Sequence, residues 1–436
     1  MKTFVNMYPG VAGFWEREEP HVATSSREVF NAILSSGNVE KFYHYEYFKP
    51  GTCSLFSASG TEWRTLRNIV NPSFRTNVLM LFDDNLYHHV KIFVNHLQQH
   101  VGVGADGFDI FAPVHVCTID MICDNMVGSR LLNQENLSTY MSETITEWAE
   151  STFERAFSVF WPDFYYTLSG QEKSRNKLIN MNRTLMCKMV EERIRTRKAL
   201  QEESQQSENP RIYIDILLDN LDAGILTKDG IISEIFEILV AGSITTAITN
   251  AWVFKLLALY PEIQERAYQE VKENSVDGGV RLSDLSKLVY TEMIIKETMR
   301  HFGIPVTGRY ITEDVQVDDK MTIPAGMNIC ICLHELHHDP KYWQRPGEFY
   351  PEHFSPANEK TRPKGAFVPF MGGPRVCPGS KYAMRSMKLL VASTLLRYKF
   401  STDEKPTDDL RDMDYRLVFM LFPTSGFNVK VQQRNY

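Results

Sequence analysis

The run Phe370-Met-Gly-Gly-Pro-Arg-Val-Cys-Pro-Gly379 is the most informative stretch of this chain. It predicts a loop that wraps one thiolate and presents it to a metal. Gly373 permits a tight backbone turn at dihedral angles that other residues avoid. Arg375 offers a fixed positive charge that favours the thiolate form of Cys377. The loop stops just before a helix-compatible stretch at 381–397, and the N-terminus of that helix adds a partial positive charge beside the sulfur.

A single thiolate suits haem iron better than zinc. Cys377 has no second Cys or His at metal-ligand spacing, which argues against a zinc site. One thiolate ligand on haem iron pushes electron density toward cleavage of the O–O bond. The pattern F-x-x-G-x-R-x-C-x-G is filled in full from Phe370 to Gly379. This stretch resembles the haem-binding loop of the cytochrome P-450 superfamily of haem-thiolate monooxygenases. The alternative is a buried structural cysteine in a loop rich in Gly and Pro.

The composition fits one large domain. The chain has 436 residues, of which 43% are hydrophobic, and this is ample for a large buried core. Length alone favours two or three domains, but no linker divides the sequence. Helix-periodic runs lie at 177–203 and 231–259, and strand-like runs lie at 310–331 and 426–431. These patterns predict a mainly α fold with small β-sheets (α+β). The resemblance implies a single cytochrome P-450-type domain around a buried haem, spanning 1–436.

Charge and cysteine usage exclude some classes of function. The net charge of −7 argues against nucleic acid as a partner. The seven cysteines show no disulfide framework spacing. Four of them lie in apolar stretches, as small core residues do: Cys117, Cys123, Cys330 and Cys332. We therefore expect a reducing compartment.

The sequence carries no evident targeting segment. We find no apolar run that would span a bilayer and no secretory signal at Met1. Membrane-bound relatives carry an N-terminal anchor helix and a proline-rich hinge, and we expect this protein to lack both. The resemblance implies a place at the cytosolic face of the endoplasmic reticulum (microsomal) membrane. Peripheral membrane contact would then come from surface residues.

Basic residues gather around the thiolate loop. From Lys360 to Lys388 the sequence has seven basic residues and no acidic one. One interpretation is a solvated basic face, which is the usual meaning of a charge run. The other is a surface that steers an acidic redox partner, since electrons must enter near the thiolate. The resemblance implies an NADPH-dependent flavoprotein reductase as that partner, with cytochrome b5 as a further one.

A helical pair precedes the loop by about eighty residues. Glu297 and Arg300 lie one turn apart on a single helix face. The resemblance implies that they are the family's core ion pair, which holds the thiolate loop and takes no part in catalysis. The third member of that group is usually the arginine of a P-x-R-F motif, and His353 occupies its position here. A histidine can still hydrogen-bond Glu297, but its charge depends on pH.

Several donors suit the two propionates of haem, which need cationic or polar partners in a buried site. Trp63 and Arg67 lie four residues apart and resemble the family's W-x-x-x-R helix. Arg309 resembles a strand-borne arginine that points at a propionate in relatives, and Arg375 completes the set. The resemblance implies that these four residues, with Phe370 of the loop, bind the cofactor. Each arginine taken singly is more often a surface charge.

The apolar run at 234–246 resembles the family's oxygen-groove helix. Gly242 lets a ligand approach the backbone, and the Thr245 hydroxyl can bond back into the preceding turn and bend the helix. We expect Thr245 and Thr246 to act in oxygen activation. Ile244 stands where the family carries an acid that relays protons. The alternative is a plain buried helix with two threonines.

Two further stretches, at 117–128 and 155–166, resemble the animal family-4 clan, particularly its insect branches. Members of that clan often carry a glutamate in the oxygen helix that esterifies the haem. Ala241 occupies that position here. We therefore expect haem b (iron protoporphyrin IX) to be held non-covalently.

The sequence thus predicts a haem-thiolate monooxygenase that inserts one atom of O2 into an apolar small molecule. The resemblance implies a fatty acid, a lipid hormone or a xenobiotic as substrate, NADPH-derived electrons, and Cys377 as the axial ligand of the haem iron. Substrate walls are expected at 153–166 and just before Gly242. Two alternatives stay open. One is a haem-thiolate isomerase or dehydratase that rearranges peroxides, which the missing acid at Ile244 favours. The other is a non-catalytic haem-binding remnant.

Overall fold

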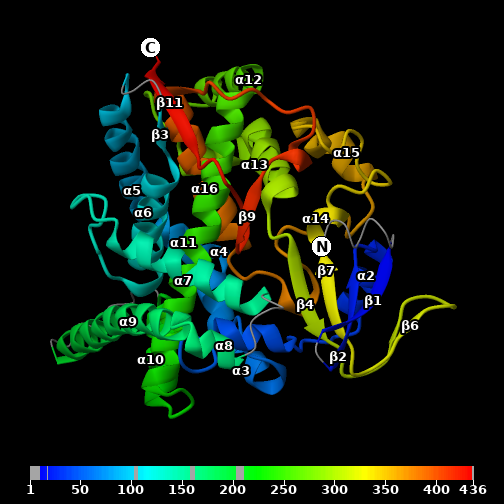
Figure 1. Cartoon of the computed structure of the whole chain (residues 1–436). Coiled ribbons are helices and arrows are strands. Elements are labelled where there is room, and N and C mark those ends of the chain that lie inside the picture. Colours follow the sequence, from blue (N-terminus) through cyan, green and yellow to red (C-terminus); the bar gives the residue numbers. More distant parts are fainter. Residues whose placement is uncertain (1–9, 17, 103–106, 158–162, 203–210, 435–436) are drawn as a thin grey trace.

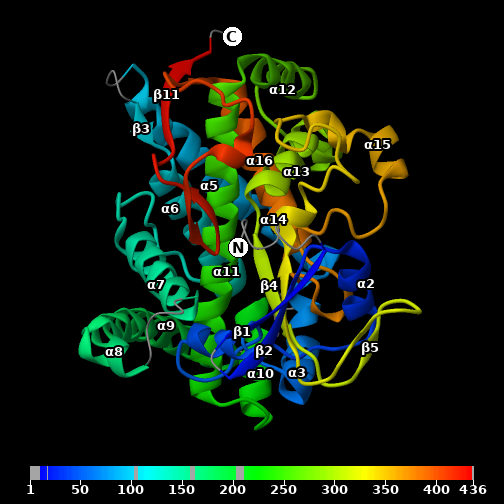
Figure 2. The same ribbon diagram turned by 45° about the vertical axis from the view of Figure 1, so that its right-hand side comes forward.

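Helix α11 (Lys228–Leu259) runs through the middle of the molecule, and the other helices pack around it (Figures 1 and 2). The computed structural model describes residues 10–16, 18–102, 107–157, 163–202 and 211–434. The largest sheet lies to one side of the helices, on the right in Figure 1. The side of α11 that faces this sheet and the C-terminal loops also faces the candidate site.

Helix α11 is apolar on every side, which is typical of a helix buried in a protein core. Thr227 caps its N-terminus by accepting a hydrogen bond from the Gly230 backbone N–H at 3.1 Å. The length and composition of α11 would also suit a membrane span, so the expectation that the sequence holds no such run was wrong. The helix is instead mostly buried against its neighbours, above all α6 (Phe111–Ile122).

Helices supply most of the remaining structure. Four of them contribute residues to the candidate site: α3 (Gly60–Val70), α7 (Tyr140–Phe157), α13 (Val289–Phe302) and α16 (Ser380–Arg397). The other α-helices are α2 (Arg27–Ser35), α4 (Thr76–Leu79), α5 (Asp83–His96), α8 (Asp163–Leu168), α9 (Gln171–Glu202), α10 (Tyr213–Asp222), α12 (Pro261–Glu273), α14 (Leu333–Leu336) and α15 (Pro356–Thr361).

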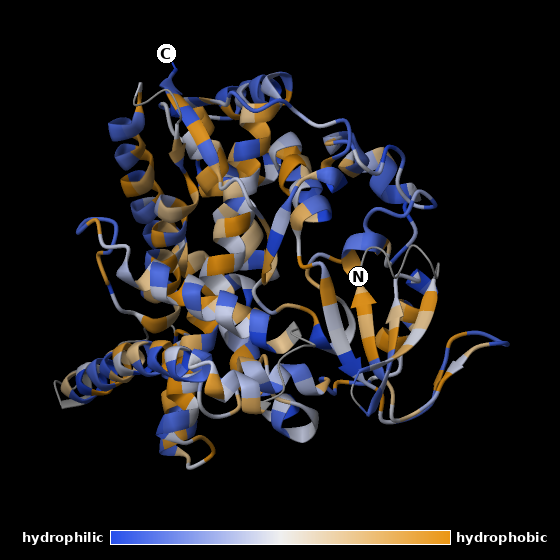
Figure 3. Ribbon diagram, in the orientation of Figure 1, coloured by the Kyte–Doolittle hydropathy of each residue, from blue (hydrophilic) through white to orange (hydrophobic). Residues whose placement is uncertain are grey.

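The strands form small separate sheets. The largest has the order β1-β2-β7-β4, in which only the β2–β7 pair is parallel. Its strands are β1 (Val11–Glu16), β2 (Glu19–Thr24), β4 (Val306–Tyr310) and β7 (Asn328–Cys332). Strand β7 is buried along its whole length and mostly hydrophobic (Figure 3), as suits an inner strand. The smaller sheets contain β3 (Phe108–Asp109), β8 (Tyr398–Ser401) and β11 (Asn428–Gln433); β9 (Tyr415–Val418) and β10 (Met420–Pro423); and β5 (Val315–Gln316) and β6 (Thr322–Ile323).

The predicted fold class is confirmed, since small sheets accompany a mainly helical domain. The expected helices at 231–259 and 381–397 are α11 and α16. The expected helix at 177–203 lies within α9, although residue 203 is outside the described residues. All seven cysteines are free, and the four predicted core cysteines are buried.

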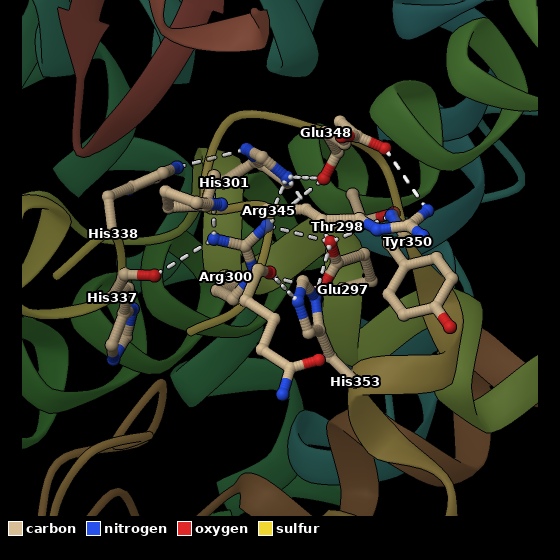
Figure 4. A network of polar contacts seen from close by, with 12 residues as sticks. Glu297, Thr298, Arg300, His301, His337, His338, Arg345, Glu348, Tyr350 and His353 are labelled. Carbon is tan, nitrogen blue, oxygen red and sulfur yellow. Dashed lines mark hydrogen bonds and ion pairs between the residues drawn. The ribbon is translucent and has the colours of Figure 1, made fainter. Parts of the chain in front are cut away.

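The side chains of Glu297 and Arg300 meet on α13 in the protein interior (Figure 4). Both are fully buried, and two hydrogen bonds of 2.8 Å join the guanidinium to the carboxylate. The Tyr350 backbone N–H donates to Glu297 at 3.0 Å, and His353 Nδ1 lies 3.2 Å from both carboxyl oxygens. Burial alone would raise the pKa of Glu297, but the charge and hydrogen bonds of Arg300 hold it well below the usual value.

Arg300 also reaches the segment that leads to the cysteine loop. Its Nη1 donates to the carbonyl oxygens of His337 and Pro346, both at 2.9 Å. The ring of His337 accepts a hydrogen bond from the Val368 backbone N–H at 3.1 Å, two residues before Phe370. The Arg300 guanidinium therefore connects α13 to residues 337 and 346. The His337 ring in turn connects this segment to Val368, just before the cysteine loop.

Arg300→Met should leave the Glu297 carboxylate buried without its counter-charge. We expect a loss of about 3–5 kcal/mol in the free energy of unfolding, by analogy with other broken buried pairs. The matched control is Arg281→Met, since Arg281 is 58% exposed and lies 3.9 Å from Asp277. That exposed pair should contribute about 0–1 kcal/mol. Denaturant unfolding and haem content are measured for both variants. Equal losses in Arg300→Met and Arg281→Met would show that the buried pair does not stabilise the fold.

Three buried histidines lie beside Arg300. His301 Nδ1 is 2.9 Å from His338 Nε2, and His338 Nδ1 is 2.7 Å from the His334 carbonyl oxygen (Figure 4). Burial, and then the charge of Arg300, lower the pKa of His301 to about 4. Burial also lowers the pKa of His337 to about 3 and that of His338 well below its usual value.

These depressed pKa values predict acid sensitivity. Between about pH 6.5 and pH 4 the unfolded chain protonates its histidines while the folded protein keeps these three neutral, so the unfolded state binds more protons. The free energy of unfolding should then decrease as the pH is lowered, by about 1.4 kcal/mol per pH unit for each such histidine. His338→Gln should reduce the slope of the unfolding free energy against pH by the contribution of one histidine. His88→Gln, at a side chain that is 41% exposed, should leave that slope unchanged. Urea unfolding at several pH values measures the slopes, and identical slopes for parent and His338→Gln would contradict the assignment.

Candidate functional site

An enclosed cavity lies between α11, β4 and the loop before α16. Its volume is about 320 Å³, within the range of small-molecule sites. Its walls are mainly apolar and include the aromatic side chains of Phe48, Phe56, Phe74, Trp148, Phe153, Phe236 and Phe419. Two further hollows, along α9 and between α2 and β5, are more open grooves on the surface. The enclosed cavity is therefore the candidate site.

Cys377 lines this cavity from the loop at 370–379. Its backbone N–H donates to the Phe370 carbonyl at 2.9 Å and closes the loop. Gly373 has φ = +64°, in the left-handed region that favours glycine, and a Cβ there would lie 3.0 Å from the Leu34 carbonyl oxygen. The tight turn expected at this glycine is thus present, and it holds the loop against α2.

The charge beside the sulfur comes from Arg67. Burial raises the pKa of the Cys377 thiol, while the backbone N–H groups of Gly379 and Ser380 and the Arg67 guanidinium act in the opposite direction. Those two N–H groups belong to the N-terminus of α16, where the sequence predicted a helix end. Arg375, which the sequence suggested beside the sulfur, directs its donors to backbone carbonyls.

Arg375 instead ties together loops from the first part of the chain. Its guanidinium donates to the Val39 carbonyl at 2.6 and 2.9 Å, to the Leu55 carbonyl at 3.3 Å and to the Ala58 carbonyl. The Trp63 ring lies 4.5 Å from the guanidinium carbon. The cysteine loop is therefore fixed to residues more than three hundred positions away in the sequence.

The cavity is lined by more positive than negative charge. Arg67 from α3, Arg309 from β4 and Arg375 all contribute to the wall, with Trp63 beside them. Arg309 is 2% exposed, and its guanidinium donates to its own neighbour, the Gly308 carbonyl, at 2.8 Å. Burial, and then the charge of Arg309, lower the pKa of Arg375 to about 9. None of these three arginines forms an ion pair with a carboxylate within the described parts of the chain.

This donor set fits haem. Guanidinium groups that are buried (Arg309) or half-buried (Arg67 and Arg375) and have no carboxylate partner suit a ligand that brings two carboxylates of its own. The cysteine sulfur in the same cavity suits the axial position of haem iron. The structure thus gathers Trp63, Arg67, Arg309, Phe370, Arg375 and Cys377 around one cavity. Their individual roles toward the cofactor are taken up below as proposals.

Three ionisable residues of the cavity escaped the sequence reasoning. Lys41 is half-buried, and its Nζ lies 3.7 Å from the centre of the Tyr45 ring. Glu234 and Glu237 of α11 also line the cavity. The two glutamates precede Gly242 on the predicted oxygen helix by about two turns and one turn, so helical periodicity could have placed them there. Lys41 belongs to no recognisable motif.

Thr245 and Thr246 line the cavity from α11. The Thr245 hydroxyl donates to the Ala241 carbonyl at 2.8 Å, the back-bond into the preceding turn that the sequence suggested. A Cβ on Gly242 would lie 2.6 Å from Ile122, so this glycine serves the close approach of α6 to α11 as well as the cavity wall. Ile244 is fully buried in the hydrophobic core and does not line the cavity.

The predicted substrate walls are present only in part. Just before Gly242, the side chains of Phe236, Glu237, Ile238 and Val240 line the cavity. From the stretch at 153–166, Phe153 lines it, while Phe164 and Tyr165 on α8 are 68% and 58% exposed. Residues 158–162 of that stretch lie outside the described residues.

The predicted basic face at 360–388 breaks up in the structure. Arg375 lies in the interior, Lys388 is buried and bonded to Glu292 at 2.8 Å, and Arg385 is paired with Asp83. A further member, Arg362, packs over the Trp343 ring. Only Lys360, Lys364 and Lys381 are exposed. The run spans α15, a loop and α16, which point in different directions, so its charges do not form one surface.

The comparisons with known proteins agree with this site. The family model described as Cytochrome P450 matches residues 1–431. Cytochrome P450 4V2 of Rattus norvegicus is 29% identical over 97% of this chain and 82% of its own length. Cytochrome P450 4c3 of Drosophila melanogaster is 27% identical over 98% and 82%, and cytochrome P450 4X1 of Homo sapiens is 27% identical over 99% and 86%. The family match covers nearly the whole length, and the cysteine loop and the apolar cavity agree with it. This chain therefore belongs to the cytochrome P450 family.

Proposed function

We propose that this haem-thiolate monooxygenase hydroxylates an apolar small molecule with electrons that originate from NADPH. The observation that carries the proposal is the enclosed apolar cavity, into which both Cys377 and Thr245 project from separate elements. Fatty acids, lipid hormones and xenobiotics all have the apolar surface that such walls would bury. The aromatic walls exclude water, so that the reaction proceeds away from solvent.

The cofactor is proposed to be haem b, held without a covalent bond to Ala241, which has no carboxylate to offer. Thiolate-ligated haem iron supplies the activation of O2. Cys377 would provide the thiolate, and Phe370 would hold the loop through the Cys377 N–H bond. Trp63, Arg67, Arg309 and Arg375 would bind the two propionates. Thr245 and Thr246 would act in oxygen activation, with Thr245 Oγ1 holding a proton at the cavity wall.

Glu297, Arg300 and His353 are proposed to act as the structural core that supports the cysteine loop. Their polar contacts are with one another, with backbone groups of 337–350, with the His301 ring and with Arg362, and none of the three lines the cavity. A change in any of them should act on folding and cofactor retention before it acts on the reaction.

Electrons are proposed to enter from a flavoprotein reductase, with cytochrome b5 as a second donor, on the surface beside the cysteine loop. Lys381 at the start of α16 is exposed and contacts Thr76 at 3.2 Å. Met80 and Leu81, which follow α4, are 58% and 49% exposed. An exposed cation next to apolar side chains suits an acidic partner with a small apolar contact. This smaller surface replaces the basic face that the sequence suggested.

Peripheral contact with the cytosolic face of the endoplasmic reticulum membrane is also proposed. The support is α8, where Phe164, Tyr165 and Leu168 are 68%, 58% and 67% exposed. Aromatic and aliphatic side chains gathered on a short exposed helix suit the interface between lipid and water.

A haem-thiolate isomerase or dehydratase acting on peroxides is the second candidate. The supporting observation is Ile244, because an aliphatic side chain at this position delivers no proton, and such enzymes need neither proton delivery nor a reductase. NADPH consumption that depends on added reductase separates the two candidates. Its absence, combined with turnover of a hydroperoxide, would favour the isomerase.

Cys377→His tests the axial ligand. We expect the variant to retain some haem but to lose the strongly red-shifted Soret band that a thiolate–carbonyl complex gives in the reduced protein. Cys187→His is the matched control, since Cys187 lies on α9 outside the cavity. The carbonyl spectra of both variants and the parent decide the matter. An unchanged spectrum in Cys377→His would mean that another residue binds the iron.

Ile244→Asp tests proton delivery. Because the parent lacks an acid at this position, we expect it to release much of its NADPH-derived reducing power as hydrogen peroxide. Help from one positioned acid is typically about 10²–10⁴-fold, enough to decide between product and leakage. Because Ile244 lies behind the cavity wall, the aspartate should raise the product formed per NADPH consumed by passing its proton through the neighbouring Thr245 hydroxyl, at a cost in stability from burying the carboxylate.

Product, peroxide and NADPH must be measured in one reconstituted reaction. Ile244→Asn is the control, since it adds polarity without an acid. A tightly coupled parent whose coupling falls in Ile244→Asp would refute the proton-delivery argument.

A further inference from the structure

Two glutamates of α11 differ in how their oxygens are used. Glu234 Oε1 accepts the Leu55 backbone N–H at 2.7 Å, and its Oε2 accepts the Tyr213 hydroxyl at 2.8 Å. Glu237 lies one turn further along, where the nearby Phe56 backbone N–H acts to lower its pKa. Its second oxygen, Oε2, is buried and has no hydrogen-bond partner among the described residues. Both carboxyl oxygens of Glu234 thus accept hydrogen bonds, whereas one oxygen of Glu237 has no partner among the described residues.

The free oxygen of Glu237 lies in a cavity that has a mainly apolar lining and a few charged groups, among them Lys41 and Arg375. Glu237 lines the same cavity as Cys377, and the neighbouring wall is aromatic. The ring centroids of Phe56 and Phe48 are 5.6 Å apart, and that of Phe419 lies 6.2 Å from Phe56. A polar atom buried in such a wall without a partner costs free energy unless a ligand satisfies it.

The protonation of Glu237 fixes what it can offer. Burial, and then the nearby Glu234, raise the pKa of the Glu237 carboxyl well above its usual value, despite the opposing charges of Lys41 and Arg375. A neutral carboxyl has one O–H donor, and Oε2 is the oxygen that no described group binds. Oε2 then presents an O–H donor to the cavity.

We propose that Glu237 is a specificity-determining residue that donates a hydrogen bond to an uncharged oxygen of the substrate, in a ketone, aldehyde, ester or alcohol. The preferred substrates are then apolar molecules that carry such a group, in preference to plain hydrocarbons, free carboxylates or organic cations. The inference rests on the proposed function in one respect, namely that this cavity receives the substrate.

Lys41 is the competing donor. It lines the same cavity, and its ammonium lies 3.7 Å and 4.9 Å from the ring centres of Tyr45 and Phe56. A carboxylate-bearing ligand would be expected to choose Lys41, while a ketone could use either group. The experiment must therefore separate the two residues.

The test is calorimetric titration of the haem-loaded enzyme with ligands of equal chain length. The probes are a straight-chain alkane, its methyl ketone, its primary alcohol, its carboxylate and its quaternary ammonium salt. The ketone accepts hydrogen bonds but donates none, so its preference over the alkane reports a donor in the protein. One hydrogen bond should make the ketone bind about 3- to 10-fold more tightly than the alkane in the parent.

Three variants assign the donor. Glu237→Gln keeps an N–H donor and should retain the preference for the ketone. Glu237→Met should abolish or invert it, because the ketone then loses its partner while the alkane does not. Lys41→Met should leave it unchanged. A general loosening of the Phe56 loop in Glu237→Met would weaken all ligands alike and so is separable from loss of the donor.

Several outcomes would overturn the proposal. They are an alkane that matches the ketone in the parent, a ketone preference that survives in Glu237→Met, a preference that disappears in Lys41→Met, and tightest binding of the carboxylate or the ammonium salt. Calorimetry needs no reductase or oxygen, and each variant's carbonyl spectrum reports the haem thiolate independently. A failure of the proposed oxidation chemistry would therefore leave this binding result intact, and the reverse also holds.

Discussion

The interaction on which the site depends is the engagement of Arg300 with its surroundings. Its Nε and Nη2 bind both oxygens of Glu297, and its Nη1 holds two carbonyls of the segment that leads to the cysteine loop. A guanidinium presents its five donors in a fixed planar fork, so this geometry sets the direction of the chain as well as its stability. The loop can therefore offer Cys377 to the cavity although most of its own backbone lies outside regular secondary structure.

The second constraint is charge. Four cationic side chains line the cavity: Lys41, Arg67, Arg309 and Arg375. Buried cations need counter-charge, and the two carboxylates of haem are a source of it. A ligand that binds only the folded protein stabilises it, so loading with haem and stability of the fold are linked. Glu237 lines the same cavity, and its Oε2 has no hydrogen-bond partner among the described residues.

Sequence reasoning reached the elements but not their partners. Period and length identified α11 and α16, and the spacing around Cys377 identified the loop, because these signals are local. The surroundings of Arg375 are not local: its acceptors are Val39, Leu55 and Ala58, which the fold brings from the other end of the chain. The basic run at 360–388 was misinterpreted as one surface for the same reason. Its basic residues are neighbours in the sequence, but the change from helix to loop separates their side chains in the fold. Glu237 could be singled out only from the structure, in which both oxygens of Glu234 are hydrogen-bonded and Oε2 of Glu237 is not.

The most direct test of the account is anomalous diffraction at the iron absorption edge from crystals of the purified holoenzyme. The account predicts one strong iron peak inside the cavity, within bonding distance of the Cys377 sulfur and below the α11 turn that carries Thr245. It also predicts porphyrin carboxylates beside Arg67, Arg309 and Arg375. An iron peak bonded to any other side chain, or a porphyrin whose carboxylates point away from these arginines, would contradict it.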